Sequence, residues 1–205
     1  MSTVESEIQV AKLACDLIKE TPLSSWEDDT SVGRWMKRNF PIVRNITLSQ
    51  TPWVFAIRRE ILSRDPVKPA YNWESRYQLP RDCLRLLPLR MSGYVNGTLI
   101  PYEREGSWIL TNGVSDLKVR MIFEQKDAST WSPLFIDALS TALALRMSQW
   151  LTGKNTFTQM MQKLYETAMT AATFANGAEG VAAHTTGTYY DDVRQGFDYV
   201  TYRRG

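Results

Sequence analysis

The stretch PLFIDALSTALALRMSQWL, residues 133–151, decides the fold. It is apolar on nearly every side of a helix, and Ser132 and Pro133 supply an N-cap and a proline suited to the first helical position. Asp137 and Arg146 interrupt the apolar run, so we expect no membrane span here. We therefore expect residues 133–151 to form the most deeply buried helix of the protein.

A second helix is expected directly after this one. Gly153 suits the end of the first helix and Asn155 suits the cap of the next, which we place at residues 156–175. The short connection predicts that the two helices form an antiparallel hairpin, with Leu164 among the side chains that face the core. The apolar positions of this second helix are Phe157, Met160, Met161, Leu164, Ala168, Ala171 and Ala175.

Two more helices are expected in the N-terminal part of the chain. An apolar row predicts a helix over residues 3–19, which a Thr-Pro pair ends because the residue before a proline avoids the helical region. The next helix covers residues 30–51, with Asp29 or Thr30 as its N-cap. Pro41 falls inside it, and we expect a kink rather than two helices because the apolar period continues. Its apolar stripe is Val32, Trp35, Met36, Phe40, Val43 and Ile46.

The middle of the chain changes from a helical to a strand period. In LKVRMIF, residues 117–123, every second side chain is apolar, which is the alternation of a half-buried strand. Together with the further candidates, this strand predicts a β-rich insertion over about residues 53–125. The further strand candidates are residues 53–58, 77–87, 94–103 and 108–111.

Together these patterns predict an α+β fold: an antiparallel four-helix bundle with a small β-rich insertion between the second and third helices and an extended C-terminal arm. We expect the main domain to cover residues 1–180 and the arm to cover residues 181–205. The arm contains no Leu, Ile or Met, so it cannot build a core of its own and should become ordered only against a partner. The side chains that we expect to meet that partner are Tyr189, Tyr190, Phe197, Tyr199, Tyr202, Arg203 and Arg204.

The residue types that catalysis needs are scarce. The one histidine, His184, belongs to a Gly/Ala-rich part of the arm, where a catalytic base is not held rigidly. Cys15 and Cys83 form no C-x-x-C pair, and a single histidine does not complete a zinc site. The glycine-rich nucleotide motifs are absent from the sequence. We therefore expect no enzyme activity, no metal and no cofactor, and predict a binding or assembly protein.

Two patterns keep other functions open. Glu103 and Glu105 could share one side of a strand, as a glycosidase carboxylate pair would, although the surrounding residues favour the charged tip of a hairpin. Arginines interleaved with aromatics could follow phosphates, although nearby acids and a formal net charge of +2 favour ordinary paired surfaces. These arginines are Arg58, Arg59, Arg76, Arg81, Arg85 and Arg90.

A series of short segments forms a recognisable pattern along the chain. In order, they are FPIVR (40–44), TPWVFA (51–56), YQLPRDCLR (77–85), YEREG (102–106), ILT (109–111), PLFIDAL (133–139), LTG (151–153), YE (165–166) and EG (179–180). Their order and spacing cover about residues 5–180, and the arm lies outside the pattern. Together these segments resemble the tail tubular protein A and head–tail connector (adaptor) family of tailed bacteriophages.

The resemblance implies a virion structural protein at the head–tail junction, made in the host cytoplasm. It implies a ring of identical copies, typically twelve, between the portal protein and the downstream tail or neck protein. Genomic DNA would contact the lumen only in passing, and no membrane or cofactor is implied. The alternative from another class is a DNA-binding or hydrolytic tail component, one that degrades peptidoglycan or polysaccharide.

Overall fold

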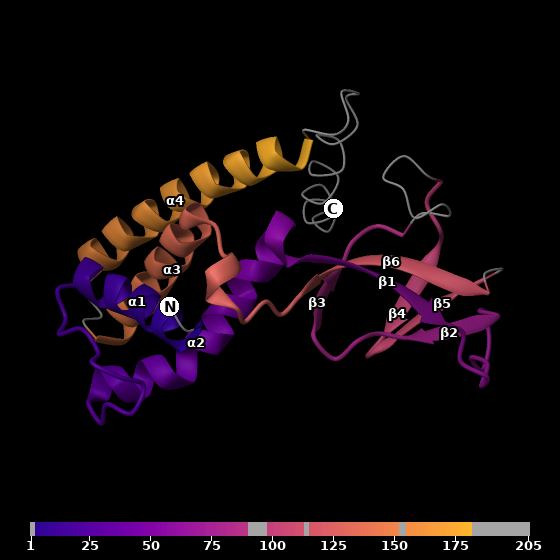
Figure 1. Ribbon diagram of the computed structural model, residues 1–205, viewed down its shortest axis with the longest axis horizontal. Coiled ribbons are helices and arrows are strands. Elements are labelled where there is room, and N and C mark those ends of the chain that lie inside the picture. Colours follow the sequence, from indigo (N-terminus) through magenta and orange to yellow (C-terminus); the bar gives the residue numbers. More distant parts are fainter. Residues whose placement is uncertain (1–2, 90–97, 113–114, 152–154, 182–205) are drawn as a thin grey trace.

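The computed structural model describes residues 3–89, 98–112, 115–151 and 155–181. Within these residues the chain is an α+β protein with four α-helices, two before and two after a set of six β-strands (Figure 1). The helices occupy one end of an elongated molecule and the strands occupy the other. The predicted α+β class and the position of the β insertion are confirmed. The helices are α1 (Thr3–Leu17), α2 (Ser31–Gln50), α3 (Pro133–Leu151) and α4 (Asn155–Val181).

Helix α3 is the core helix, as its sequence predicts. It contacts α1, α2 and α4, and its Phe135, Leu139 and Leu143 side chains are fully buried. Ser132 caps its first turn, because the Oγ atom accepts a hydrogen bond from the backbone N–H of Phe135 at 3.2 Å. The rest of the helical core is arranged around this helix.

Helix α1 ends two residues before the predicted position, and the cause is local. Lys19 has a φ angle of +60°, in the left-handed region. The backbone N–H of Glu20 donates to the carbonyl of Cys15 at 3.0 Å, and that of Lys19 donates to Asp16 at 3.1 Å. This pair of bonds is a Schellman-type helix end, so the helix stops before the Thr-Pro pair is reached.

Helix α2 begins and ends close to the predicted bounds. Thr30 is the N-cap, with its Oγ1 accepting from the backbone N–H of Gly33 at 2.9 Å, and the chain stays in one helix through Pro41. The placement of Ile46 on the buried stripe is wrong, because its side chain is 39% exposed. The C-terminal half of α2 also packs against the strands, so a different side, including Arg44, is buried there.

The strands form two antiparallel three-stranded sheets among the described residues. They are β1 (Ile57–Ser63), β2 (Ser75–Gln78), β3 (Cys83–Leu86), β4 (Tyr102–Glu105), β5 (Trp108–Thr111) and β6 (Asp116–Phe123). One sheet has the order β1-β6-β3 and the other has the order β2-β5-β4. In the central strand β6, Leu117, Val119 and Met121 are buried, which confirms the predicted alternation up to Met121; at the end of the strand Ile122 is also buried and Phe123 is only half-buried, so the alternation does not continue there.

The strand candidate at residues 53–58 is partly wrong. The chain first forms a short 3-10 helix, η1 (Val54–Ala56), and strand β1 begins only at Ile57. The indole of Trp53 accounts for the turn. It is fully buried, and its Nε1 donates to the carbonyl of Thr47 at 3.0 Å, which brings the chain back against α2 before the strand starts.

The other strand candidates have different outcomes. Residues 108–111 are strand β5, which confirms that candidate. Residues 77–87 are not one strand, since they contain the end of β2 and all of β3, separated by Pro80, which has no N–H for a ladder. Of residues 94–103, positions 94–97 lie outside the described residues and β4 begins at Tyr102.

Helix α4 continues beyond the predicted end at residue 175. It runs to Val181, through Asn176 and Gly177, which resemble a helix stop in the sequence. The Asn176 side chain does not end the helix, because its amide group is bound to the chain at η1 instead. Residues 182–205, with most of the predicted arm, lie outside the described residues.

Candidate functional site: a buried ionic junction and an exposed helical row

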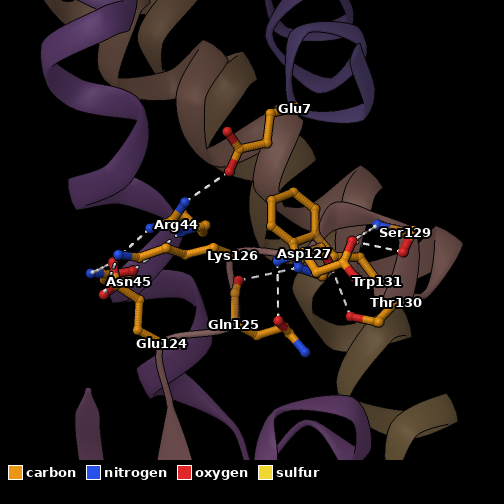
Figure 2. Close-up of polar contacts among 10 residues, drawn as sticks. All are labelled: Glu7, Arg44, Asn45, Glu124, Gln125, Lys126, Asp127, Ser129, Thr130 and Trp131. Atoms are coloured by element: carbon orange, nitrogen blue, oxygen red, sulfur yellow. Dashed lines mark hydrogen bonds and ion pairs between the residues drawn. The ribbon is translucent and has the colours of Figure 1, made fainter. Parts of the chain in front are cut away.

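The helices and the strands are joined through one buried arginine (Figure 2). The Arg44 side chain on α2 is 5% exposed. Its Nη1 atom lies 2.8 Å from Oε1 of Glu7 on α1, and its Nη2 atom lies 2.6 Å from Oε1 of Glu124, directly after β6. One side chain therefore links two helices to the segment that returns from the strands.

Two further side chains complete this ionic junction. Asn45 donates from Nδ2 to Oε1 of Glu124 at 3.1 Å, and its Oδ1 accepts from Nε of Arg44 at 3.3 Å. Lys126 Nζ lies 3.3 Å from the other oxygen, Oε2, of Glu124. The junction thus pairs two bases with two acids. Each acid is occupied by a base, which suits a structural connection rather than acid–base chemistry.

The two carboxyl groups of the junction have opposite pKa shifts. Burial raises the pKa of Glu7 above its ordinary value of 4.5, and the attraction of Arg44 offsets this only in part. Burial also acts on Glu124. However, hydrogen bonds from Asn45 and Lys126, with the charges of Lys126 and Arg44, outweigh it and lower the pKa of Glu124.

An aromatic cluster supports the junction on its helical side. The ring centroids of Trp53, Phe55 and Trp131 lie 4.9, 5.0 and 5.3 Å from that of Phe135 on α3, all in edge-to-face geometry. Such pairs stabilise by about 0.5–1.5 kcal/mol each beyond their burial. Trp131 also donates from Nε1 to the carbonyl of Gln125 at 3.3 Å (Figure 2). These contacts therefore hold the chain both where it leaves α2 for β1 and where it returns from β6 to α3.

Asn176 fixes the C-terminal half of α4 to the same region. Its Nδ2 donates to the carbonyl of Pro52 at 3.0 Å, and its Oδ1 accepts from the backbone N–H of Val54 at 2.8 Å. The side chain is almost fully buried, so both of its hydrogen-bonding groups are used.

The outer side of α4 carries an apolar row that the described part of the chain leaves uncovered. Met160, Leu164 and Phe174 are 55%, 37% and 74% exposed. Leu164 is therefore not a core residue, and that prediction is wrong. The helix is instead packed through a different row: Met161, Ala168, Ala172 and Asn176.

The exposed row has the spacing of a surface that packs against another chain segment. Its members follow one another at steps of four and three residues, so they share one side of the helix. The row contains no charged side chain, which is unusual for a solvent-facing helix side. We call the following set the α4 row: Met160, Leu164, Thr167, Ala171, Phe174 and Ala178, all of them exposed.

The residues predicted to meet a partner lie beyond the described part of the chain. Tyr189, Tyr190, Phe197, Tyr199, Tyr202, Arg203 and Arg204 are all in residues 182–205, as is His184. Of the two cysteines, Cys15 is buried and Cys83 is half-buried, and both are free thiols. Burial raises the pKa of Cys15 to about 11 and also raises that of Cys83, so neither thiol is activated.

Glu103 and Glu105 lie on the exposed strand β4. Trp73 donates from Nε1 to Oε2 of Glu103 at 2.9 Å, and Gly106 turns the chain into β5 with a φ angle of +56°. This is the solvated hairpin that the sequence favours, with all four residues of β4 exposed.

Two of the arginines of residues 58–90 pair with acids, and Arg85 instead donates from Nη1 to the backbone carbonyl of Gln50 at 3.3 Å. Arg58 binds both oxygens of Asp82 at 2.8 and 2.7 Å, and this contact lowers the pKa of Asp82. Arg76 pairs with Asp65 at 3.0 Å, and its guanidinium lies 4.3 Å from the ring centroid of Trp108. Arg59 and Arg81 are exposed, and Arg90 lies outside the described residues. These pairs do not build a continuous phosphate-binding surface.

Neither models of known protein families nor the curated proteins give a match to this chain. Among the described residues, acids, histidines and cysteines form no group that could hold a metal ion. The helices of the described ranges include none with a stretch long and apolar enough to cross a bilayer.

Sequence reasoning misses both features of this site, although each leaves a signal. Arg44 is a charged residue in the middle of an otherwise apolar turn, FPIVRNI, which is the pattern of a buried and paired charge. The apolar residues of α4 include the adjacent pair Met160 and Met161, which point in directions about 100° apart, so the apolar side of this helix is wide enough to extend beyond one packed face.

Proposed function

We propose that this protein is a head–tail connector, or adaptor, of a tailed bacteriophage virion, similar to tail tubular protein A. Copies of the chain form a ring, typically of twelve, at the head–tail junction. The portal protein lies on one side of the ring and the downstream tail or neck protein on the other. The proposal rests on the segments that resemble this family and on one structural observation, the exposed α4 row.

A ring of identical copies needs two different and complementary surfaces on each copy. The α4 row is one candidate for such a surface, because it is apolar, uncharged and left open by the described part of the chain. Soluble monomers rarely expose contiguous apolar patches of this kind without a binding role. The row therefore supports an assembly protein over an enzyme.

The finer architecture belongs to the same proposal. The helices form an antiparallel bundle that stacks beside the bundles of neighbouring copies, and residues 181–205 form an extended arm. The aromatic and basic side chains of that arm meet a neighbouring copy or the portal. The ionic junction supports this assembly because it fixes the helices and the strands to each other, so that each copy enters the ring as one unit.

The chemistry of the ring lumen follows from the charge balance. The chain has 24 basic and 22 acidic residues, so it has little net attraction for a polyanion. A channel of this composition contacts the genomic DNA as it passes without retaining it. We propose no cofactor, no membrane contact and no enzymatic turnover.

The test is to measure the mass of the purified protein, alone and with its portal, and to image the product by negative-stain electron microscopy. We expect rings that bind the portal. Phe174→Glu should reduce ring formation, because it places a charge in the α4 row. The matched control is Tyr71→Glu, which changes an equally exposed aromatic residue at 76% exposure near the strands.

Two results would contradict the proposal. One is a protein that stays monomeric alone and with the portal at all concentrations. The other is cleavage of peptidoglycan, polysaccharide or nucleic acid by the purified protein that disappears in Glu103→Gln or Glu105→Gln.

A further inference from the structure

The α4 row has the dimensions of a binding track for a short peptide segment. From Met160 to Phe174 it covers about 21 Å at about 1.5 Å per residue. Met160 and Phe174 are 55% and 74% exposed. Lys163 lies at the edge of the row and makes no ion pair among the described residues. The track thus carries apolar side chains and Thr167, whose hydroxyl donates to the carbonyl of Lys163 at 2.9 Å, with one positive charge beside it.

The chain itself contains a segment that matches this track. The helix that bears the row ends at Val181, and residues 182–205 follow directly. Within them, residues 189–202 supply five aromatic side chains and the acids Asp191, Asp192 and Asp198. Extended at about 3.3 Å per residue, this segment spans about 43 Å, which is more than the length of the row.

We propose that residues 189–202 of one copy bind along the α4 row of a neighbouring copy. The aromatic side chains cover Met160, Leu164 and Phe174, and one of the three aspartates pairs with Lys163. This inference rests on the proposed ring. It assigns the two complementary surfaces that a ring needs, since each copy offers its row to one neighbour and its segment to the other.

The proposal excludes an arrangement in which residues 189–202 bind to the α4 row of their own chain. A segment folded back on its own α4 would cover the row and leave neither surface for a neighbour. The strand edge at β4 is a poorer acceptor, because its exposed Glu103, Arg104 and Glu105 are the charges that protect an edge from strand addition. The row offers the segment an apolar partner without such charges.

Cross-linking between two differently labelled chains tests the proposal. Cys83→Ser removes the more accessible native thiol, and Cys15 is buried with its pKa raised to about 11. In this background, chains with Ala171→Cys are mixed with chains carrying Tyr190→Cys or Tyr199→Cys, and a short bis-maleimide is added. The control replaces Ala171→Cys by Tyr71→Cys, which is exposed near the strands.

We expect a cross-linked dimer from Ala171→Cys at a yield about ten-fold above the Tyr71→Cys control, because binding raises the local concentration of the two thiols. Rings of normal mass without this dimer would overturn the inference and leave the proposed function standing. An internal cross-link in a single chain carrying both substitutions, with none between chains, would also overturn it. Wild-type protein that forms no ring, alone or with the portal, would overturn both.

Discussion

The molecule buries one arginine, Arg44, and exposes one phenylalanine, Phe174, and a comparison of their surroundings shows how differently the two side chains are accommodated. Arg44 is 5% exposed and is surrounded by partners from its own chain: Glu7, Glu124 and Asn45. Phe174 is 74% exposed, and the described part of the chain brings nothing over it. The buried charge is explained by contacts within one copy. Contacts within one copy do not explain the exposed phenylalanine, and we propose that a neighbouring copy covers it.

The largest expected effect is the difference in stability loss between a core substitution and a substitution in the α4 row. Leu139→Ala on α3 should destabilise the protein by about 3–4 kcal/mol, because a fully buried leucine leaves a cavity. Leu164→Ala should cost less than about 1 kcal/mol, because that side chain is 37% exposed. Denaturant unfolding of the two variants measures the difference. Equal losses would show that α4 is covered on both sides within one copy.

The next effect tests the ionic junction. Arg44→Ala should cost about 2–3 kcal/mol, which is below the 3–5 kcal/mol of a fully buried pair because Glu7 and Glu124 keep partial contact with water. Thermal unfolding measures this loss. Arg34→Ala is the control, since it removes an ion pair with Asp29 in which both side chains are well exposed. Similar results for the two would mean that Arg44 contributes no more than a surface charge.

Glu124 and Glu7 should contribute to the pH dependence of stability with opposite signs. The pKa of Glu124 is lowered, so the unfolded chain takes up a proton before the native state does, and stability falls as pH drops below 4.5. The pKa of Glu7 is raised, so the native state takes up its proton first. This adds stability as pH falls through that raised pKa toward 4.5.

Two variants separate these contributions. Glu124→Gln should flatten the loss of stability on the acid side, and Glu7→Gln should steepen it. Denaturant midpoints from about pH 7 down to about pH 3 measure the two slopes. Slopes that change in the same direction would contradict the assignment.

The smallest effect on stability is expected at the exposed end of the α4 row. Phe174→Ala should change the free energy of unfolding by less than about 0.5 kcal/mol, because the side chain has few contacts to lose. Assembly should nevertheless weaken, as the mass of the ring-forming species reports. A large loss of monomer stability would indicate that another part of the same chain covers the Phe174 side chain.

The parts of this fold that the sequence predicts are those with local causes. The core helix α3 follows from a serine cap and a continuous apolar run, and β6 follows from alternation within a few residues. The junction has no such local cause, because Glu7 and Glu124 lie 37 and 80 positions from Arg44. Asn176 resembles a helix stop until its partners Pro52 and Val54, more than a hundred residues away, are known.

The exposed α4 row could not be predicted from the sequence for a different reason. The apolar positions of α4 extend around about half of the helix, and periodicity alone does not tell which part meets α3. Met161 and Ala168 are buried while Leu164 is exposed. The distinction depends on how α4 is rotated against its neighbours, and that rotation is set by distant contacts such as the one at Asn176.

The anchoring of Asn176 also determines how the molecule would bear a mechanical load. Tension applied beyond Val181 runs along α4 and reaches Asn176 within little more than one helical turn. There, two hydrogen bonds to the backbone around η1 pass the force into the chain between α2 and β1. A pull along α4 therefore reaches the backbone between α2 and β1 as well as the contacts between α4 and α3.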